Sequence, residues 1–370
     1  MTDPFLSLPG AVESPGLGTP AHYGFPLPEQ RAFARGEAII SLSHHGVVTV
    51  TGPDRLSWLD SMTSQSLRGL TPGVSTESLL LDPQGHIEQV LRVVDDGEQT
   101  WLLVDADAHE ALTAYLHRMR FALRVEVHDR SAELATVAVW SHGPAEAALA
   151  ELGVALVQWR DPWPVVAPGG AQYAAVPHAG EDWAVTHIVV PRSGLGAVAE
   201  LVRSGAASVA GLLALDALEI RAWRPSLRGE VDERALPHEF DWLRSAVHLN
   251  KGCYRGQETV AKVHNLGHPP RRLVLLHLDG SRGELPEPGA LVYEATQPQD
   301  PAAKPVGRIT RAALHYEWGA IALALLKRSA PEDATLVVAG PDGEWISASQ
   351  EVIVPSDAGR TRAVPRMRRL

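Results

Sequence analysis

The chain has 370 residues and a formal net charge of −11, with 45% hydrophobic and 21% charged residues. This balance is typical of a globular protein with a sizeable core, and the length indicates roughly two to three domains. The single cysteine, Cys253, excludes an internal disulfide and the usual multi-cysteine metal sites, but not a cluster shared with a partner. The acidic balance argues against stable nucleic-acid binding.

The N-terminal part of the chain carries no targeting pattern. Residues 1–24 read as an irregular segment rich in Pro and Gly, and the first 30 residues hold no Lys or Arg, unlike a signal or transit peptide. No apolar run is long enough to predict a membrane span. We therefore expect a cytoplasmic protein with no membrane association.

From residue 25 onward, strand-like and helix-like patterns alternate. The patterns predict strands near residues 38–50, 78–81, 87–94, 101–104, 123–127, 134–140 and 183–190. They predict helices after Pro53 and at residues 107–120, 144–152, 195–203 and 209–223. His44 and His45, placed on a strand, are expected to face opposite ways and to bind no metal. The mixture indicates an α+β body over residues 25–268.

After Pro269 and Pro270 the pattern changes to short strands separated by turn signals such as Pro288–Gly289. This spacing predicts a small barrel or sandwich over residues 269–355. Residues 356–370 form a basic tail rich in arginine.

The segment around the cysteine is the strongest candidate for a functional centre. It reads Lys251–Gly252–Cys253–Tyr254–Arg255–Gly256–Gln257–Glu258. Helical spacing begins at Gln257, so Cys253 is expected just before a helix N-terminus and between two cations, which favours a thiolate. The two glycines suit a turn where backbone approaches a ligand. The alternative is that Cys253 is a small buried hydrophobe.

The same region is a basic island on an acidic protein. Between Lys251 and Arg272 five cations face one acid, Glu258. Such a patch suits an anionic small ligand, and a solvated surface explains the charge equally well. We expect the Tyr254 ring to pack in the core rather than to stack on a ligand. Gln257 and Glu258 fit two roles equally well, namely contact with a ligand or closure of the turn at the start of the helix.

The pattern Lys-Gly-Cys-Tyr-x-Gly-Gln-Glu at Lys251–Glu258 resembles the signature of the YgfZ family, folate-binding proteins related to the T-protein of the glycine cleavage system. Softer similarities lie at residues 50–59, 80–87 and 305–310, so the resemblance covers about residues 25–355. It implies a T-protein-like folate-binding body of mixed subdomains around a central channel, followed by a small C-terminal β-barrel. It also implies tetrahydrofolate or a derivative as cofactor.

The resemblance further implies a role in the assembly or repair of iron–sulfur enzymes, including tRNA-modifying ones, with folate and iron–sulfur or cluster-assembly proteins as partners. Cys253 and Lys251 would then act in catalysis, as a thiolate and the cation that holds it. The ligand contacts would come from Lys251, Tyr254, Arg255, Gln257, Glu258 and Arg272, with Arg255 and Arg272 attracting the glutamate tail. No metal ligand is expected.

Two departures from the T-protein pattern bear on the reaction. Glu88 and Gln89 stand where T-proteins carry an acidic pair, and Arg221 stands where they carry a pterin-binding Glu. Both departures weaken the alternative of a folate-dependent aminomethyl or one-carbon transferase. Such an enzyme needs an acid near the pterin, and Glu88 is the only candidate for it. A third hypothesis is a non-catalytic scaffold that binds a partner through the barrel or the tail.

Overall fold

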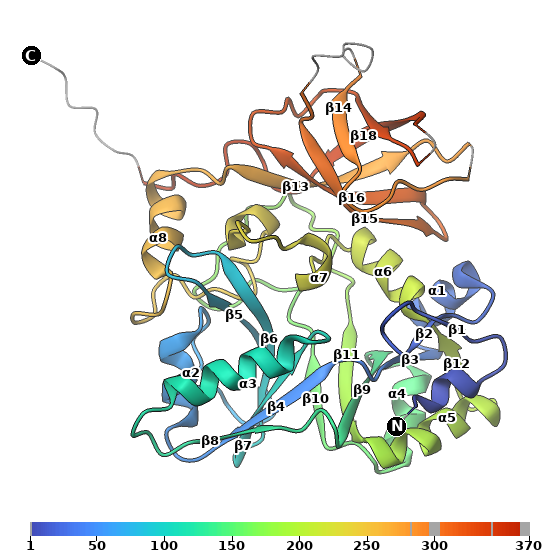
Figure 1. The fold of residues 1–370 in the computed structure, drawn as a ribbon, viewed down its shortest axis with the longest axis vertical. Coiled ribbons are helices and arrows are strands. Elements are labelled where there is room, and N and C mark those ends of the chain that lie inside the picture. The colour runs from blue at the N-terminus through green and yellow to red at the C-terminus, as the bar shows by residue number, and fades with distance from the viewer. Residues whose placement is uncertain (1, 282, 296–303, 342, 363–370) are drawn as a thin grey trace, which may run out of the picture.

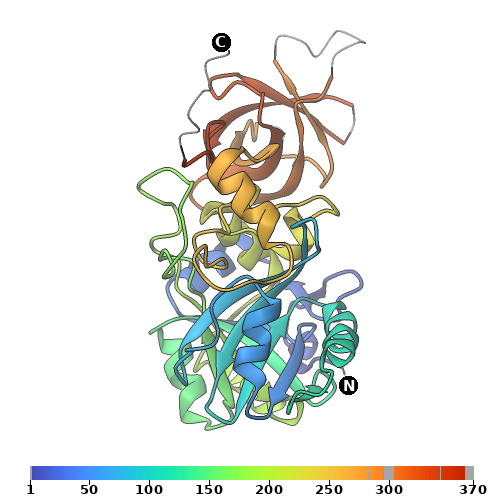
Figure 2. The same cartoon turned by 90° about the vertical axis from the view of Figure 1, so that its left-hand side faces the viewer.

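The computed structural model describes residues 2–281, 283–295, 304–341 and 343–362; most of the predicted basic tail, residues 363–370, lies outside these ranges. Two five-stranded sheets and a closed barrel form the frame of the molecule, with the barrel above the two sheets in the view of Figure 1. Figure 2 shows the same barrel stacked at one end of the long axis. Within the described ranges, no helix has the length and apolar character needed to cross a bilayer.

The first sheet has the strand order β10-β11-β9-β3-β12. Its strands are β3 (Ala38–Leu42), β9 (Leu134–Trp140), β10 (Val157–Arg160), β11 (Val185–Pro191) and β12 (Ser208–Ala210). Its helices are α1 (Pro26–Ala34), α4 (Pro144–Glu151), α5 (Leu195–Arg203) and α6 (Leu212–Arg221), with a 3₁₀ turn η2 (Arg192–Gly194). Nearly every residue of β3, β9 and β11 is buried, because helices and the second sheet cover both faces.

The second sheet has the order β5-β6-β7-β4-β8. Its strands are β4 (Gly46–Thr51), β5 (Ser75–Leu81), β6 (Ile87–Asp95), β7 (Gln99–Val104) and β8 (Glu126–Asp129), and its helices are α2 (Arg55–Met62) and α3 (Ala108–Met119). The two sheets meet where β10 contacts β5 and β6. There the indole of Trp159 donates a hydrogen bond of 2.7 Å to the carbonyl of Thr76.

The barrel closes in the order β13-β16-β15-β14-β17-β18. Its strands are β13 (Arg271–Leu278), β14 (Leu291–Glu294), β15 (Gly307–His315), β16 (Gly319–Lys327), β17 (Leu336–Ala339) and β18 (Trp345–Val352). Between the sheets and the barrel lie α7 (Leu227–Glu230), η3 (Pro237–Phe240) and α8 (Gln257–Leu266). One buried apolar cluster runs from Phe33 and Leu79 through Trp242 to Leu273 and Ile321, so body and barrel share a core.

Two parts of the chain differ from the sequence prediction. Residues 1–24, predicted irregular, contain η1 (Pro4–Ser7) and a hairpin of β1 (Val12–Glu13) and β2 (Pro20–His22). Phe5 is fully buried, and the Asp3 carboxylate accepts hydrogen bonds from Ser41 and Ser43 at the end of β3. The predicted helix 209–223 is instead β12 followed by α6. The apolar run was too short to separate a buried strand from a helix.

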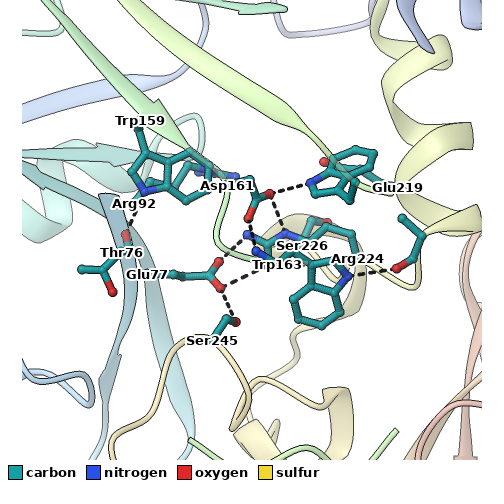
Figure 3. A network of polar contacts seen from close by, with 12 residues as sticks. Thr76, Glu77, Arg92, Trp159, Asp161, Trp163, Glu219, Arg224, Ser226 and Ser245 are labelled. Atoms are coloured by element: carbon teal, nitrogen blue, oxygen red, sulfur yellow. Dashed lines mark hydrogen bonds and ion pairs between the residues drawn. The ribbon is translucent and has the colours of Figure 1, made fainter. Parts of the chain in front are cut away.

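A buried charge network joins the two sheets to the end of α6 (Figure 3). The Nε of Arg224 donates to Asp161 at 2.9 Å, and its two terminal nitrogens donate to the Glu77 carboxylate at 2.5 and 3.2 Å. Ser245 adds a hydrogen bond to Glu77 at 2.9 Å. Arg224 is only 4% exposed, so its charge is neutralised by two carboxylates rather than by water. The carbonyl of Arg224 also accepts a hydrogen bond from Arg311, which lines the central cavity described next.

Candidate functional site

A cavity of about 300 Å³ lies where the two sheets, α6 and the barrel strand β15 meet. Its polar walls come from the β3–β4 turn, from β6, from the end of β7, from β11, from α6 and from β15. The charged and imidazole side chains that line it are His44, His45, Arg92, Asp105, His187, Asp216, Glu219, Arg228 and Arg311. These residues are spread over most of the sequence, and only the fold brings them together.

Three histidines form one wall of this cavity. The ring centroids of His44 and His45 are 4.6 Å apart, and those of His45 and His187 are 5.9 Å apart. Burial lowers the pKa of His44 to about 4 and the pKa of both other rings well below the usual value, so all three are neutral at pH 7. The prediction that His44 and His45 face opposite ways was wrong, because they lie in the turn after β3 and not on a strand.

The Nδ1 atoms of these three rings are buried and have no hydrogen-bond partner among the described residues. A neutral imidazole donates from one ring nitrogen and accepts at the other, so each ring retains unused hydrogen-bonding capacity. Leaving a buried polar atom unpaired costs about 1–3 kcal/mol. The three imidazole rings line the cavity, and their Nδ1 atoms themselves have almost no solvent-accessible surface.

Beside the histidines, Arg92 donates a 2.8 Å hydrogen bond to Asp105. Burial disfavours the charged carboxylate, but the Arg92 guanidinium and the neighbouring His45 outweigh this effect and lower the pKa of Asp105 to about 2. The pair is thus an internally neutralised ion pair at the cavity wall. It leaves the histidines as the groups with unsatisfied hydrogen-bonding atoms.

Another part of the lining combines acids of α6 with an arginine of the barrel. Arg311 of β15 contacts Glu219, Asp216 and Glu230 at 2.5, 3.3 and 3.0 Å and donates a hydrogen bond to the carbonyl of Arg224. Burial raises the pKa of Glu219 to about 7 against the opposing effect of Arg311, and it also raises the pKa of Asp216. Glu219 is therefore a group that can hold or release a proton near neutral pH.

Sequence reasoning missed Glu219 as a site residue. It assigned the pterin-contact position to Arg221, whereas the structure places the Arg221 guanidinium 5.3 Å from the ring of Trp318 and Glu219 at the cavity. The detectable signal was the pair Asp216 and Glu219, three residues apart on one helix, because such residues share a helix face.

The cysteine segment lies elsewhere. Cys253 is exposed and is absent from the lining of the central cavity. The segment packs on the hairpin that precedes β6, where Gly256 has φ +83° and a Cβ there would lie 2.6 Å from the Asp82 carbonyl. Both glycine-containing pieces of the family resemblance, 82–87 and 251–258, therefore meet in one tight contact that excludes larger residues.

Lys251 serves as a structural clamp. Its ammonium donates hydrogen bonds to the carbonyls of Asp60, Thr63 and Gln65 at 2.5, 2.8 and 2.6 Å, and its side chain is 3% exposed. Burial lowers its pKa to about 8, while the nearby Asp60 carboxylate opposes the shift. An ammonium has three donors, and all three are used inside the protein. Lys251 thus has no free donor for the Cys253 thiolate or a ligand in this conformation.

Most other residues of the predicted site are also buried or form contacts within the protein. Tyr254 is buried in the core, and the Gln257 amide donates to the Lys251 carbonyl at 3.3 Å. Glu258 is exposed at the start of α8. Arg272 is fully buried in the barrel, where it donates to Ala330 and Gln350. The structure therefore does not bring Arg272 to the cysteine.

Arg255 lines a separate groove of about 320 Å³ between β6 and α3. It forms two hydrogen bonds with Glu88, at 2.7 and 3.1 Å, and its guanidinium lies 5.6 Å from the Tyr115 ring centroid. Glu88 and Gln89 both line this outer groove. The position that sequence comparison offered for the acid of a transferase thus lies outside the central cavity.

Residues 14–157 match the family described as the GCVT N-terminal domain. An aminomethyltransferase of Thermus thermophilus is 28% identical over 81% of this chain and 82% of its own length. A chloroplastic protein of Arabidopsis thaliana, named only as a suspected transferase, is 25% identical over 70% of this chain. The aligned region covers 60% of that protein's own length.

Among solved structures, the glycine cleavage system aminomethyltransferase T of Bartonella henselae superposes with a TM-score of 0.73, at 18% identity and 96% coverage of both chains. The chain therefore has the GcvT-like fold, as the sequence predicted. These findings make the chain similar to GcvT-type aminomethyltransferases, with the family match confined to residues 14–157. They do not distinguish the YgfZ branch within that group.

Proposed function

We propose that this protein binds tetrahydrofolate or a derivative in the central cavity and supports the assembly or repair of iron–sulfur enzymes, including tRNA-modifying ones. The observation that carries the proposal is the cavity between the two sheets, α6 and β15, with three neutral imidazole rings in its lining. The relatives named aminomethyltransferases supply the ligand class. We also propose the functional division into the body, residues 25–268, and the barrel, residues 269–355.

The residues of the cavity suit the pteridine head of a folate. That ring system presents N–H donors and ring-nitrogen or carbonyl acceptors along its edge, and neutral imidazoles complement either kind of group. Ligand pockets usually enclose about 300–1,000 Å³ with a few placed polar groups. His44, His45 and His187 would contact the head group, while Glu219 would hold a proton at its carboxyl.

Cys253 has a separate part in this proposal. Its thiol is exposed, whereas the cavity is lined by other residues. An exposed thiol is open to a protein partner, and a thiolate is the form that attacks electrophiles or binds iron and sulfur. We therefore assign Cys253 the contact with iron–sulfur or cluster-assembly proteins, and the cavity the folate.

Anaerobic calorimetric titration with tetrahydrofolate tests the cavity. We expect saturable binding that weakens about tenfold in His187→Leu, because one hydrogen bond of about 1.4 kcal/mol is lost. The matched control is His128→Leu, at a half-exposed histidine of β8 outside the cavity. Absence of binding at millimolar tetrahydrofolate would overturn the folate proposal.

Complementation of a deletion strain tests the cysteine. We expect Cys253→Ala to lose iron–sulfur enzyme activity while retaining tetrahydrofolate affinity. Full activity with this variant would remove Cys253 from the proposed role.

A second candidate function is folate-dependent aminomethyl transfer. Glu219 favours it, since a carboxyl with a pKa of about 7 lies in the cavity itself and can act as a general acid. Turnover of an aminomethyl donor with added tetrahydrofolate, lost in Glu219→Gln, would establish this reaction. No turnover by the intact protein would set it aside.

A further inference from the structure

The turn between β15 and β16 presents an aromatic patch where the barrel meets the body. Trp318 of this turn is 37% exposed, Tyr316 is half-buried, and Leu314 at the end of β15 is 48% exposed. Both strands contact α6, and β15 also contacts α1. In Figure 1, α1 and α6 lie on the side of the molecule away from α8, which follows the cysteine segment. The patch is therefore distinct from the surface around Cys253.

The body holds this turn in a fixed position. Gln30 of α1 is only 2% exposed, and its side-chain amide donates to the Leu314 carbonyl at 2.9 Å and accepts from the Tyr316 backbone N–H at 3.0 Å. The Nδ1 of His315 accepts from the backbone N–H groups of the next two turn residues, at 3.2 Å each. Burial lowers the pKa of His315 to about 4, so its ring is neutral at pH 7 and can accept these bonds. A preformed surface loses little conformational entropy when a partner binds.

Arginines of the body lie over the aromatic rings of the turn. The guanidinium of Arg31 is 5.5 Å from the Tyr316 ring centroid, and that of Arg221 is 5.3 Å from the Trp318 ring. Arg35, four residues after Arg31 at the end of α1, shares its helix face. Among the residues that the structure describes, none pairs with these three side chains through an ion pair or a side-chain hydrogen bond. Their N–H donors are therefore available to carboxylates from outside the chain.

The residue types and the charge of the patch favour an acidic protein as partner. Trp, Tyr and Arg are the side chains that most often carry the binding energy of protein interfaces. A guanidinium presents its donors as a planar fork that matches a carboxylate. The whole chain carries a net charge of −11, so a local cluster of cations directs an acidic partner to this one surface. Within the turn, Glu317 adds one exposed acid beside the three arginines.

A nucleic-acid strand fits the patch less well. Base binding without sequence preference uses exposed aromatic faces as stacking platforms. The Tyr316 ring already has the His315 ring centroid at 4.6 Å and the Arg31 guanidinium at 5.5 Å. The Trp318 ring likewise has Arg221 over it. Carboxylates need only the edges of the guanidinium groups, so they can bind without displacing these contacts.

We propose that this patch docks an acidic segment of a partner protein. Carboxylates of the segment pair with Arg31 and Arg221, and an apolar side chain between them packs on Trp318. The inference does not rest on the proposed folate binding, because none of the patch residues lines the central cavity. It adds an interaction surface on a different side of the molecule from the exposed thiol.

The test uses random twelve-residue peptides displayed on phage and selected against the intact protein. We expect the enriched sequences to combine Asp or Glu with large apolar residues. The most enriched peptide, labelled with fluorescein, is then titrated by anisotropy. Arg221→Gln and Trp318→Leu should each weaken its binding about tenfold, as expected of central interface residues. Added salt should also weaken binding, because it screens the charge pairs.

Matched controls test whether the position matters. Arg118→Gln removes an exposed arginine that lies 6.0 Å from the Tyr115 ring on α3, and Trp345→Leu removes a tryptophan of β18 that is 43% exposed. Both should keep the affinity for the peptide. Equal weakening in these controls would overturn the patch, because it would indicate a diffuse effect of surface charge.

Three further results would also overturn the proposal. They are the absence of any enriched sequence, enriched sequences without acids, and displacement of the peptide by a ten-nucleotide oligouridylate at equal affinity, which would identify a nucleic-acid surface. Thermal unfolding of Trp318→Leu, together with unchanged tetrahydrofolate affinity, would show that loss of docking is local. Failure of the intact protein to bind tetrahydrofolate would leave this inference in place, since peptide binding is measured without folate.

Discussion

The central cavity and the cysteine segment are built in opposite ways. The cavity collects side chains from β6, β11, α6 and β15, and many of them hold unused or perturbed polar groups. The cysteine segment is eight consecutive residues, several of which already contact other parts of the protein. Lys251 donates hydrogen bonds to three carbonyls, Arg255 pairs with Glu88, and Tyr254 packs in the core. A contiguous motif thus marks a structural junction that presents one exposed thiol, while the ligand-binding capacity lies in dispersed residues.

This comparison assigns different sensitivities to the two regions. Beside the cavity, the buried Arg224 network ties Asp161 and Glu77 to the end of α6 (Figure 3), and the Arg224 carbonyl accepts a hydrogen bond from the cavity residue Arg311. The cysteine segment depends on the Lys251 clamp and on the contact between Gly256 and the 82–86 hairpin. Substitutions of Arg224 and Lys251 should therefore change mainly stability, whereas substitution of the exposed Cys253 should change mainly function.

The largest effect is expected for Arg224→Met. The change leaves Glu77 and Asp161 as buried carboxylates without their cation, which costs about 3–5 kcal/mol when one partner of a buried pair is removed. Urea unfolding of the purified variant measures the loss. The control is Arg203→Met, whose exposed pair with Glu200 on α5 should contribute less than about 1 kcal/mol. Equal losses in both variants would show that the buried network stabilises the fold no more than a surface ion pair does.

The fold was largely predictable because its signals are local. Short apolar runs bounded by turn residues predicted β9 and the barrel strands, and the glycine and helical spacing after Cys253 predicted α8. Short segments failed, as at β12, since a three-residue buried strand has no periodicity of its own. The packing of residues 1–24 depends on Asp3 reaching Ser41 and Ser43, which no local pattern reveals.

A smaller loss is expected for Lys251→Met. The variant keeps the apolar stem and removes an ammonium that satisfies three carbonyls, so we expect a loss of about 2 kcal/mol in the free energy of unfolding. Tetrahydrofolate affinity should change little, because Lys251 does not line the central cavity. The matched control is Lys262→Met, at an exposed lysine of α8. A large loss of affinity without a loss of stability would restore Lys251 as a ligand contact.

The candidate site was predictable only in part. Family resemblance located the segment that carries Cys253, and the exposed thiol is compatible with that interpretation. The cavity could not be read from the sequence, because His45, Asp105, His187 and Glu219 lie on four different segments with no common spacing.

The Glu219 carboxyl should give a pH-dependent effect. Its folded-state pKa is raised from 4.5 to about 7, so the stability it contributes is fully present below about pH 4.5 and is lost as pH rises through 7. The free energy of unfolding of the intact protein, relative to Glu219→Gln, should therefore fall between about pH 5 and 7.5, by up to about 1.4 kcal/mol per pH unit. The control variant is Glu200→Gln, at an exposed glutamate of α5. A constant difference across this range would place the pKa of Glu219 outside it.

The smallest effect on stability is expected for Cys253→Ser. The thiol is exposed and lies in a segment that Lys251 and Gly256 hold independently, so the free energy of unfolding should stay within about 0.5 kcal/mol of the parent value. Alkylation of the intact protein by iodoacetamide in its native state should be complete and leave tetrahydrofolate affinity unchanged. If alkylation blocks folate binding, the thiol and the cavity act as one site, and the separation drawn between the two regions is wrong. If it blocks only iron–sulfur enzyme support, the two regions have distinct tasks, one holding the folate and the other meeting the partner.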